Sequence, residues 1–189
     1  LKLNLINAGT EVTEQTLQSN ADLIQGYLRE RGFYNAEVSY SQQVLGNENR
    51  VAVTFQVTPN VQSKVDVFDI KIAGFELDKV KKLLKLQPGS MFSRSRLIED
   101  VDRIRAAILK QSFLAPNLEE PMVTFDAERN AISVELTGEI GSKVKVTVDV
   151  EKEKIDEKTQ ERLLPIKRQG TLEFSAIREG ARRLRNYYQ

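Results

Sequence analysis

Residues 83–113 of this chain read LLKLQPGSMFSRSRLIEDVDRIRAAILKQSF, and residues 3–33 follow the same pattern 80 positions earlier. With Gly9 set over Gly89, the two stretches align without a gap, and the same step leads on to a third copy. The apolar positions that recur in all three include Leu17, Leu97 and Ile177, and Ile24, Ile104 and Leu184. Self-similarity at a fixed period indicates an array of one supersecondary unit.

The period divides the chain into three segments, which we call repeats one, two and three. Repeat one covers residues 1–61 and is incomplete at its N-terminus, repeat two (62–139) is complete, and repeat three (140–189) is incomplete at its C-terminus. A unit as small as repeat two buries only about 60–65% of its unfolded surface, so contacts with its neighbours should add to its stability. The linkers, 59–64 and 138–142, are too short to act as free tethers, and we expect restricted angles between repeats.

Composition excludes several classes of protein and site. The net charge is +1 with acids and bases interspersed, whereas a nucleic-acid or membrane-surface binder would show a patch of one sign. The chain has no Cys, which removes disulfides and thiol chemistry, and no His, which removes the commonest general base and metal ligand. No apolar run approaches the ~18–20 residues that span a bilayer.

The complete repeat predicts the order of its elements. Residues 65–72 alternate between apolar and charged side chains, which indicates a half-buried strand. The apolar residues of this strand are Val65, Val67, Ile70 and Ile72. A short helix is expected over 77–85, and Gln87-Pro88-Gly89 ends it because proline cannot continue a helix. The inner face of this helix consists of Val80, Leu83 and Leu84.

A second, longer helix has the same start and the same apolar stripe in every repeat. Ser93 is a good N-cap, and Phe92 before it can pack onto Leu97 inside the helix. Thr13 is the corresponding N-cap in repeat one, whereas Glu173 is a weaker cap in repeat three. The inward stripes at helical spacing are Leu17, Ala21, Ile24 and Leu28; Leu97, Val101, Ile104 and Ile108; and Ile177, Ala181, Leu184 and Tyr188.

Two strands close each unit. In repeat one the long helix ends at Gly32 with an aromatic residue beyond it, which suits a Schellman stop. Ser112 takes the place of this glycine in repeat two, where a positive φ would cost it about 1 kcal/mol. Strands are expected over 36–44 and 51–57, joined by Gly46-Asn47-Glu48-Asn49, over 123–126 and 131–136, and at the start of repeat three over 144–150. Each unit therefore has the order β-α-α-β-β.

This unit resembles the polypeptide-transport-associated (POTRA) domain. Residues 27–38, YLRERGFYNAEV, are similar to the end of the second POTRA helix and the start of the second strand. Residues 70–74, IKIAG, are similar to the first strand, and 86–89, LQPG, to the end of the first helix, a place that 163–166, LLPI, takes in repeat three. Repeat two departs from the pattern at 112–116, SFLAP, which bears on its hairpin more than on its fold. The resemblance covers essentially the whole chain and implies an α+β fold of tandem POTRA units, each a three-stranded mixed sheet packed on two helices.

The resemblance also implies a function. POTRA arrays form the periplasmic arms of outer-membrane β-barrel proteins, in families that insert barrel proteins (BamA-like and TamA-like) or export partner proteins. It implies a non-catalytic arm in the periplasm, attached to the outer membrane through a C-terminal barrel. Its partners would be unfolded outer-membrane proteins or secreted polypeptides, accessory assembly proteins and that barrel. The alternative is a structural spacer in a partner-exporting (two-partner secretion) or other membrane-anchored protein, without client binding.

The sequence offers no constellation for catalysis. Its local carboxylate groupings are Glu119-Glu120 and the series Asp149, Glu151 and Glu153. These would suit an acid/base pair or a hard-metal site, but a polar loop and the outward side of a strand explain them better. The hydroxyl residues Thr13, Ser93, Ser95 and Ser175 have no base to activate them. We therefore predict no catalytic residue, no metal and no cofactor.

Basic residues gather in 79–85 and in 178–185. They suit solubility, or contact with acidic lipid head groups or an acidic partner. The GxxG loop by which KH modules grip a nucleic acid is absent from the chain. We therefore expect no nucleic-acid partner.

The candidate functional surface is the edge of a sheet. In POTRA domains the second strand lies at an edge, where an extended client can be added through main-chain hydrogen bonds. The client-binding residues predicted on this basis are Val38, Ser39, Tyr40, Ser41, Gln42 and Gln43 in repeat one, and Val123, Thr124 and Phe125 in repeat two. Repeat one is the better candidate, because Pro121 blunts the start of the strand in repeat two. The alternative is that these edges are only surface.

The two ends of the chain are expected to expose complementary apolar surface. The residues concerned are Val53, Phe55 and Val57 in repeat one, and Ile177, Leu184 and Tyr188 in repeat three. One hypothesis is a domain-swapped homo-oligomer, in which repeat three of one chain completes repeat one of another. If the ends reflect only trimming, no such exchange is needed.

Overall fold

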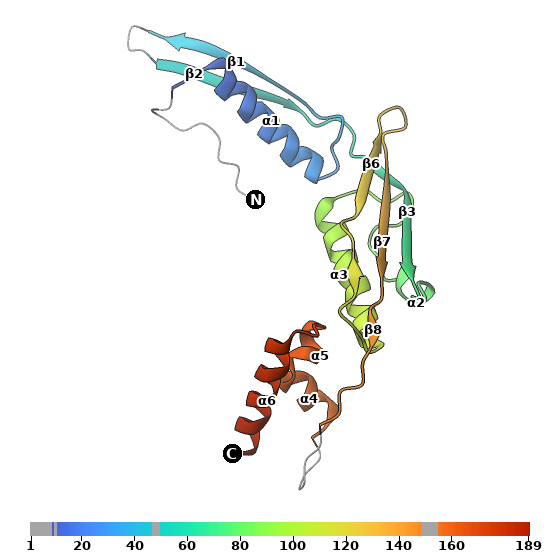
Figure 1. The fold of residues 1–189 in the computed structure, drawn as a ribbon. Helices are drawn as coiled ribbons and strands as arrows, with labels where there is room; N and C mark the ends of the chain where they lie inside the picture. Colours follow the sequence, from blue (N-terminus) through green and yellow to red (C-terminus); the bar gives the residue numbers. More distant parts are fainter. Residues whose placement is uncertain (1–8, 10, 47–49, 149–154) are drawn as a thin grey trace. The chain divides into compact units, whose positions relative to one another are not determined.

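A computed structural model describes residues 9, 11–46, 50–148 and 155–189 (Figure 1). It combines helices with small sheets, so the predicted α+β class is confirmed. The chain forms two compact units, of which the first comprises residues 1–68, 85–99 and 123–134 and the second residues 69–84, 100–122 and 135–189. Each unit contains one of the two linkers between repeats, and the division between the units runs through repeat two.

Repeat one consists of one helix beside a long hairpin. Helix α1 (Glu14–Glu30) lies along the antiparallel pair β1 (Glu37–Leu45) and β2 (Arg50–Thr58) (Figure 1). The predicted N-cap is confirmed, since Thr13 Oγ1 accepts a hydrogen bond from the Thr16 amide at 3.1 Å. Leu17, Ala21 and Ile24 are buried as expected, and Leu28 is half-buried. Residues 47–49 of the predicted hairpin loop lie outside the described residues.

The end of α1 has the predicted Schellman geometry. Gly32 has φ +90°, and its amide donates to the carbonyl of Arg29 at 2.8 Å. The next amide, of Phe33, donates to the carbonyl of Leu28 at 3.0 Å, which completes the motif. Ser112 has φ +66° at the same point of repeat two, so the predicted positive φ is confirmed.

Repeat two is built around one central strand. Strand β7 (Ala131–Glu139) pairs with β3 (Lys64–Ala73), β5 (Asn117–Leu118) and β6 (Met122–Asp126). Helix α3 (Arg94–Lys110) begins at the predicted N-cap, where Ser93 Oγ accepts from the Arg96 amide at 3.3 Å. The inward residues of α3 and β7 are fully buried, namely Leu97, Ile104, Ile108, Ile132, Val134 and Leu136. Two short strands, β4 (Phe113–Leu114) and β8 (Ser142–Lys143), pair with each other beyond the helix.

Three expectations for repeat two were wrong in detail. Helix α2 covers only Asp78–Lys81, because tight turns from Val80 to Leu83 and from Lys81 to Leu84 follow it and leave Leu83 66% exposed. Val67 is 47% exposed, because the buried side of β3 changes phase between Val65 and Ile70. Strand β7 continues to Glu139, beyond the predicted end at Leu136, because β5 pairs with its last two residues.

Repeat three is a group of three helices in the described residues. They are α4 (Glu157–Leu163), α5 (Pro165–Gln169) and α6 (Phe174–Tyr188) (Figure 1). The segment 163–166 was expected to end the first helix of repeat three, but Pro165 in it begins α5, where its missing amide hydrogen costs nothing. Glu173 makes no side-chain cap bond, so the predicted weak cap is confirmed.

Two further expectations for repeat three were wrong. Residues 144–148 form no strand, although Val144, Val146 and Val148 still alternate as half-buried residues, and 149–150 lie outside the described residues. The buried face of α6 is Ala176 and Gly180 rather than the predicted stripe, because Leu164 and Pro165 pack closely against Gly180.

Candidate binding edges and the junctions between repeats

Strand β6 is an edge strand of the repeat-two sheet. Its hydrogen-bonded neighbour is β7, and no other strand of the described residues pairs with it. Met122 and Thr124 are exposed, whereas Val123 and Phe125 are half-buried. Pro121 immediately precedes the strand. The outer side of β6 therefore presents a short row of main-chain groups without a strand partner.

Strand β1 is the longer edge. It pairs with β2 from Glu37 opposite Thr58 to Leu45 opposite Arg50, and no third strand joins this sheet in the described part of the chain. Its predicted client-binding residues alternate at the start of the strand, with Val38 and Tyr40 half-buried and the others exposed. The Tyr40 ring packs edge-on against Phe55 of β2, with ring centroids 6.2 Å apart.

The predicted site residues thus lie on two separate sheets rather than in one site. One of them, Phe125, already has a partner within the first compact unit. Its ring stacks on Tyr34 of repeat one at a centroid distance of 4.8 Å, and Tyr34 also meets Phe92 edge-on at 6.0 Å. Burial raises the pKa of the Tyr34 phenol, and the nearby carboxylate of Glu30 raises it further. Tyr34 therefore connects repeats one and two.

A polar cluster surrounds this aromatic contact. The Asn130 Oδ1 accepts from Ser63 Oγ at 2.7 Å and from Asn35 Nδ2 at 3.3 Å, and its Nδ2 donates to the Val61 carbonyl at 3.1 Å. Ser63 is fully buried. Gln62 Nε2 donates to the carbonyl oxygens of Arg31 and Phe92 at 2.7 and 2.9 Å. We call these contacts, with Tyr34, Phe92 and Phe125, junction one.

The contacts between repeats two and three, within the second compact unit, form junction two. The Ala115 amide donates to the Gly170 carbonyl at 2.7 Å, and the Val144 amide donates to the Ser112 carbonyl at 2.9 Å. Leu114, Leu164 and Ile166 form a buried apolar cluster. Packed against this cluster are Leu109, Val144, Val146, Val148 and Leu184.

Sequence reasoning missed most of junction one. Tyr34 and Asn35 were noted only as part of a family pattern, and Asn130 lies between the strands predicted over 123–126 and 131–136. The residue type of Asn130 was a signal, because Asn tolerates a left-handed backbone better than most residues. The structure gives Asn130 this backbone, with a φ of +47°. No local pattern pointed to its partners, which lie 67 to 95 positions away in sequence.

The basic and carboxylate groups noted in the sequence do not form a site in the described residues. Lys85 forms an ion pair with Glu99, and Arg182 and Arg183 both bind Glu179 at 2.8 Å. Glu119 accepts a hydrogen bond from Thr137, while Asp149, Glu151 and Glu153 lie outside the described residues. Within the described ranges, no three Asp or Glu residues gather as metal ligands would, and no helix is both long and apolar enough to cross a bilayer.

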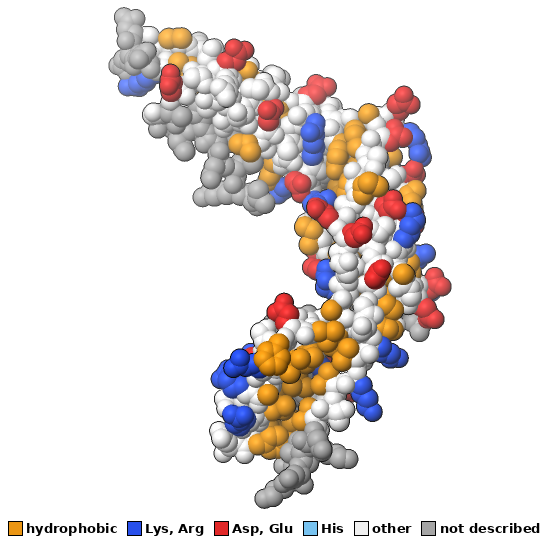
Figure 2. All heavy atoms as spheres, in the orientation of Figure 1, with side chains coloured by type: hydrophobic (Ala, Val, Ile, Leu, Met, Phe, Trp, Pro, Cys, Tyr) orange, Lys and Arg blue, Asp and Glu red, His pale blue; other side chains and the backbone are white. Residues whose placement is uncertain are grey.

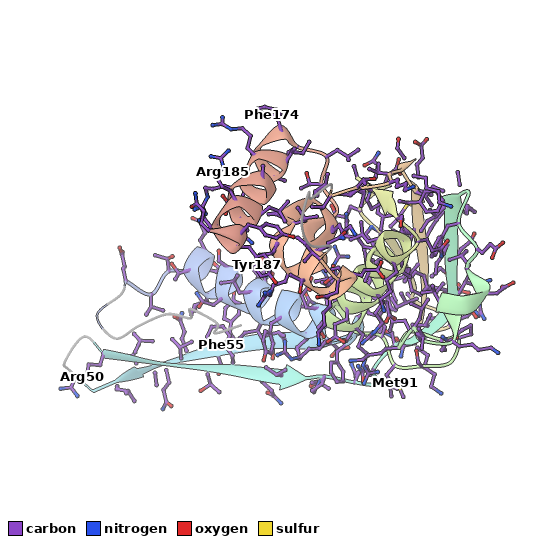
Figure 3. All side chains as sticks on the ribbon, turned by 90° about the horizontal axis from the view of Figure 1, so that it is seen from below. Arg50, Phe55, Met91, Phe174, Arg185 and Tyr187 are labelled. Atoms are coloured by element: carbon purple, nitrogen blue, oxygen red, sulfur yellow. The ribbon has the colours of Figure 1, made fainter. Side chains whose placement is uncertain are left out.

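Apolar side chains gather on the surface of the C-terminal helices (Figure 2). Ile177 is 47% exposed and Tyr188 43% exposed, and Phe174 lies at the start of the same helix (Figure 3). In repeat one, Val57 is exposed, whereas Val53 and Phe55 are half-buried. The expected exposure is confirmed for Val57, Ile177 and Tyr188 and is partial for Leu184, Val53 and Phe55. The domain swap built on it remains a hypothesis.

A comparison with protein families identifies the chain. The family model POTRA, described as surface antigen variable number repeat, matches residues 1–60 and 66–152. The chain belongs to the POTRA family. Residues 61–65, which separate the two matched segments, include part of the first linker. POTRA segments therefore lie on both sides of junction one. No curated protein matches the chain.

Several solved POTRA structures are similar to this POTRA chain. BamA POTRA3-5 of Haemophilus influenzae is 17% identical with a TM-score of 0.46, over 95% of this chain and 72% of that one. POTRA1-2 of the periplasmic domain of Omp85 from Anabaena is 18% identical with a TM-score of 0.39, over 72% of this chain and 76% of that one. BamA of Haemophilus ducreyi lacking POTRA domains 1-3 is 15% identical with a TM-score of 0.39, over 70% of this chain and 24% of that one.

Proposed function

We propose that this chain is part of a periplasmic POTRA arm of an outer-membrane β-barrel protein that assembles or translocates other polypeptides. Family membership over most of the chain supports this role. The arm would carry no catalytic activity. Its partners would be unfolded outer-membrane or secreted polypeptides, accessory assembly proteins and the barrel of the same protein.

The observation that carries the proposal is the pair of strand edges, β1 and β6. Each would receive an extended client as an added strand, through main-chain hydrogen bonds that require no particular client sequence. The client residues would run beside 38–43 on β1 and 123–125 on β6. At β6, Phe125 would contribute its main chain only, because its ring is already stacked on Tyr34.

Nuclear magnetic resonance with a labelled peptide tests this mechanism. The chain has no Cys, so a nitroxide attached to a single Cys in a barrel-strand peptide would be the only label. We expect amide shifts in 38–43 and 123–125. We also expect the paramagnetic broadening to move along each strand when the label is moved from one end of the peptide to the other.

The matched control is the same peptide with alternate backbone nitrogens methylated. This change keeps every side chain but removes the donors that strand pairing needs. We expect it to lose the shifts. Equal binding of the methylated peptide, or shifts that avoid both strands, would contradict strand addition and favour the structural spacer.

A further inference from the structure

The loop after the long helix occurs twice in the chain, at 32–36 and, 80 positions later, at 112–116. In both places this loop contacts the following repeat. Gly32 offers its carbonyl to the Ser63 amide at 2.8 Å, and its counterpart Ser112 offers its carbonyl to the Val144 amide at 2.9 Å. At each junction, a backbone amide in the linker or just beyond it is therefore held to the end of the preceding long helix.

The third residue of each loop faces the body of the next repeat. In the first loop this residue is Tyr34, which packs on the rings of Phe92 and Phe125. In the second loop it is Leu114, which lies in one buried cluster with Leu164 and Ile166. An aromatic residue thus meets aromatic partners at junction one, and an aliphatic residue meets aliphatic partners at junction two.

Close packing makes the first loop intolerant of added atoms. A Cβ atom built on Gly32 would lie 2.2 Å from the carbonyl oxygen of Phe92, and main-chain atoms cannot move aside cheaply. Phe92 is itself tied to the linker, since its amide donates to the Ser63 carbonyl at 3.0 Å. The linker thus lies between two repeats that both bind it.

We propose that the loop after the long helix is a docking element that fixes each repeat onto the next one, and that its third residue, Tyr34 or Leu114, is matched to the surface it meets. This accounts for Leu114 in repeat two at the position of Tyr34 in repeat one, because the second loop faces aliphatic residues of repeat three rather than rings. The docking role does not depend on client binding and can fail or hold independently of the proposed function.

Distance measurements between two spin labels test the docking element at junction one. Gln15→Cys on α1 and Ser133→Cys on β7 place the labels at exposed positions of the two repeats, both within the first compact unit. We expect one narrow distance distribution for the otherwise unchanged chain. We expect Gly32→Ala and Tyr34→Ala each to broaden the distance distribution at least twofold, because repeat two is then no longer held in one position against repeat one.

Gly89→Ala is the matched control for Gly32→Ala. Gly89 has φ +86°, close to the +90° of Gly32, but no atom lies within 4 Å of a Cβ placed there. We expect Gly89→Ala to leave the distance distribution narrow. Tyr40→Ala serves in the same way for Tyr34→Ala, because Tyr40 packs within repeat one.

The outcomes separate clearly. A broad distribution in the unchanged chain, or narrow distributions in both Gly32→Ala and Tyr34→Ala, would overturn the proposal. Far-ultraviolet circular dichroism on every variant shows whether it folds. If Gly32→Ala fails to fold, Tyr34→Ala decides alone, since it removes a contact without forcing a clash.

Discussion

At the scale of single residues, Gly32 and Ser112 occupy equivalent positions at the ends of the two long helices but differ in the space around them. Both have positive φ, but only Gly32 meets a neighbouring backbone that leaves no room for a Cβ. Ser112 is exposed and carries its Cβ at a cost of about 1 kcal/mol. The glycine is thus required for packing, and the serine is tolerated at the expense of strain.

Ser112→Gly should therefore stabilise the protein. Relief of about 1 kcal/mol of left-handed strain, less about 0.5 kcal/mol for the added freedom of the unfolded chain, predicts a gain of about 0.5 kcal/mol in the free energy of unfolding. Urea unfolding followed by circular dichroism measures it. Ser133→Gly, in the middle of β7, is the control and should lose stability by a similar amount. A loss at Ser112 equal to that at Ser133 would contradict the strain argument.

At the scale of elements, the features that local sequence determines were predicted well. Helix α1 and strands β1 and β2 were found to within about a residue, and the caps at Thr13 and Ser93 were correct, because apolar period and capping residues act within one turn or one strand. Helix α2 was predicted too long, because tight turns at 80–84 follow it. The exposure of Val67 was missed, because the buried side of β3 changes phase between Val65 and Ile70. The candidate edges could be named in advance, but the engagement of the Phe125 ring by Tyr34 could not.

Helix α6 gives a prediction about pH. The guanidinium groups of Arg182 and Arg183 hold the pKa of Glu179 down to about 2 from its ordinary 4.5. A pKa that is lowered in the folded state means that the ionised carboxylate stabilises the fold above pH 4.5, and that this contribution is lost as the pH falls toward 2. Carbon-13 titration of the Glu179 carboxyl should show this low pKa.

Removing either arginine should return the pKa of Glu179 toward its ordinary value, with Arg182→Ala having the larger effect because its hydrogen bonds are the leading cause of the shift. Arg178→Ala is the control, since Arg178 lies over the Phe174 ring and not on Glu179. A Glu179 pKa near 4.5 in the unchanged protein would show that these ion pairs do not persist in solution.

At the scale of the whole molecule, the repeats and the compact units do not coincide. The sequence period predicted three segments, whereas the structure places each linker inside a compact unit and divides the chain within repeat two. Main-chain hydrogen bonds of 2.7–2.9 Å tie each linker region to the preceding repeat or the following one, whereas the sequence period reports only which elements recur. Small repeats that bury little surface alone are expected to share their stability in this way.

Leu114→Ala tests how far that sharing extends. Leu114 is 4% exposed and belongs to the cluster with Leu164 and Ile166, so its truncation should cost about 2–5 kcal/mol. Hydrogen exchange followed by mass spectrometry should show faster exchange in 155–189 as well as in 113–118, with α1 unchanged. Leu17→Ala, an equal truncation at a buried site of repeat one, should do the reverse and leave 155–189 protected. If Leu114→Ala accelerates exchange only within repeat two, the leucine serves the core of its own repeat, and the stability of repeat three does not depend on junction two.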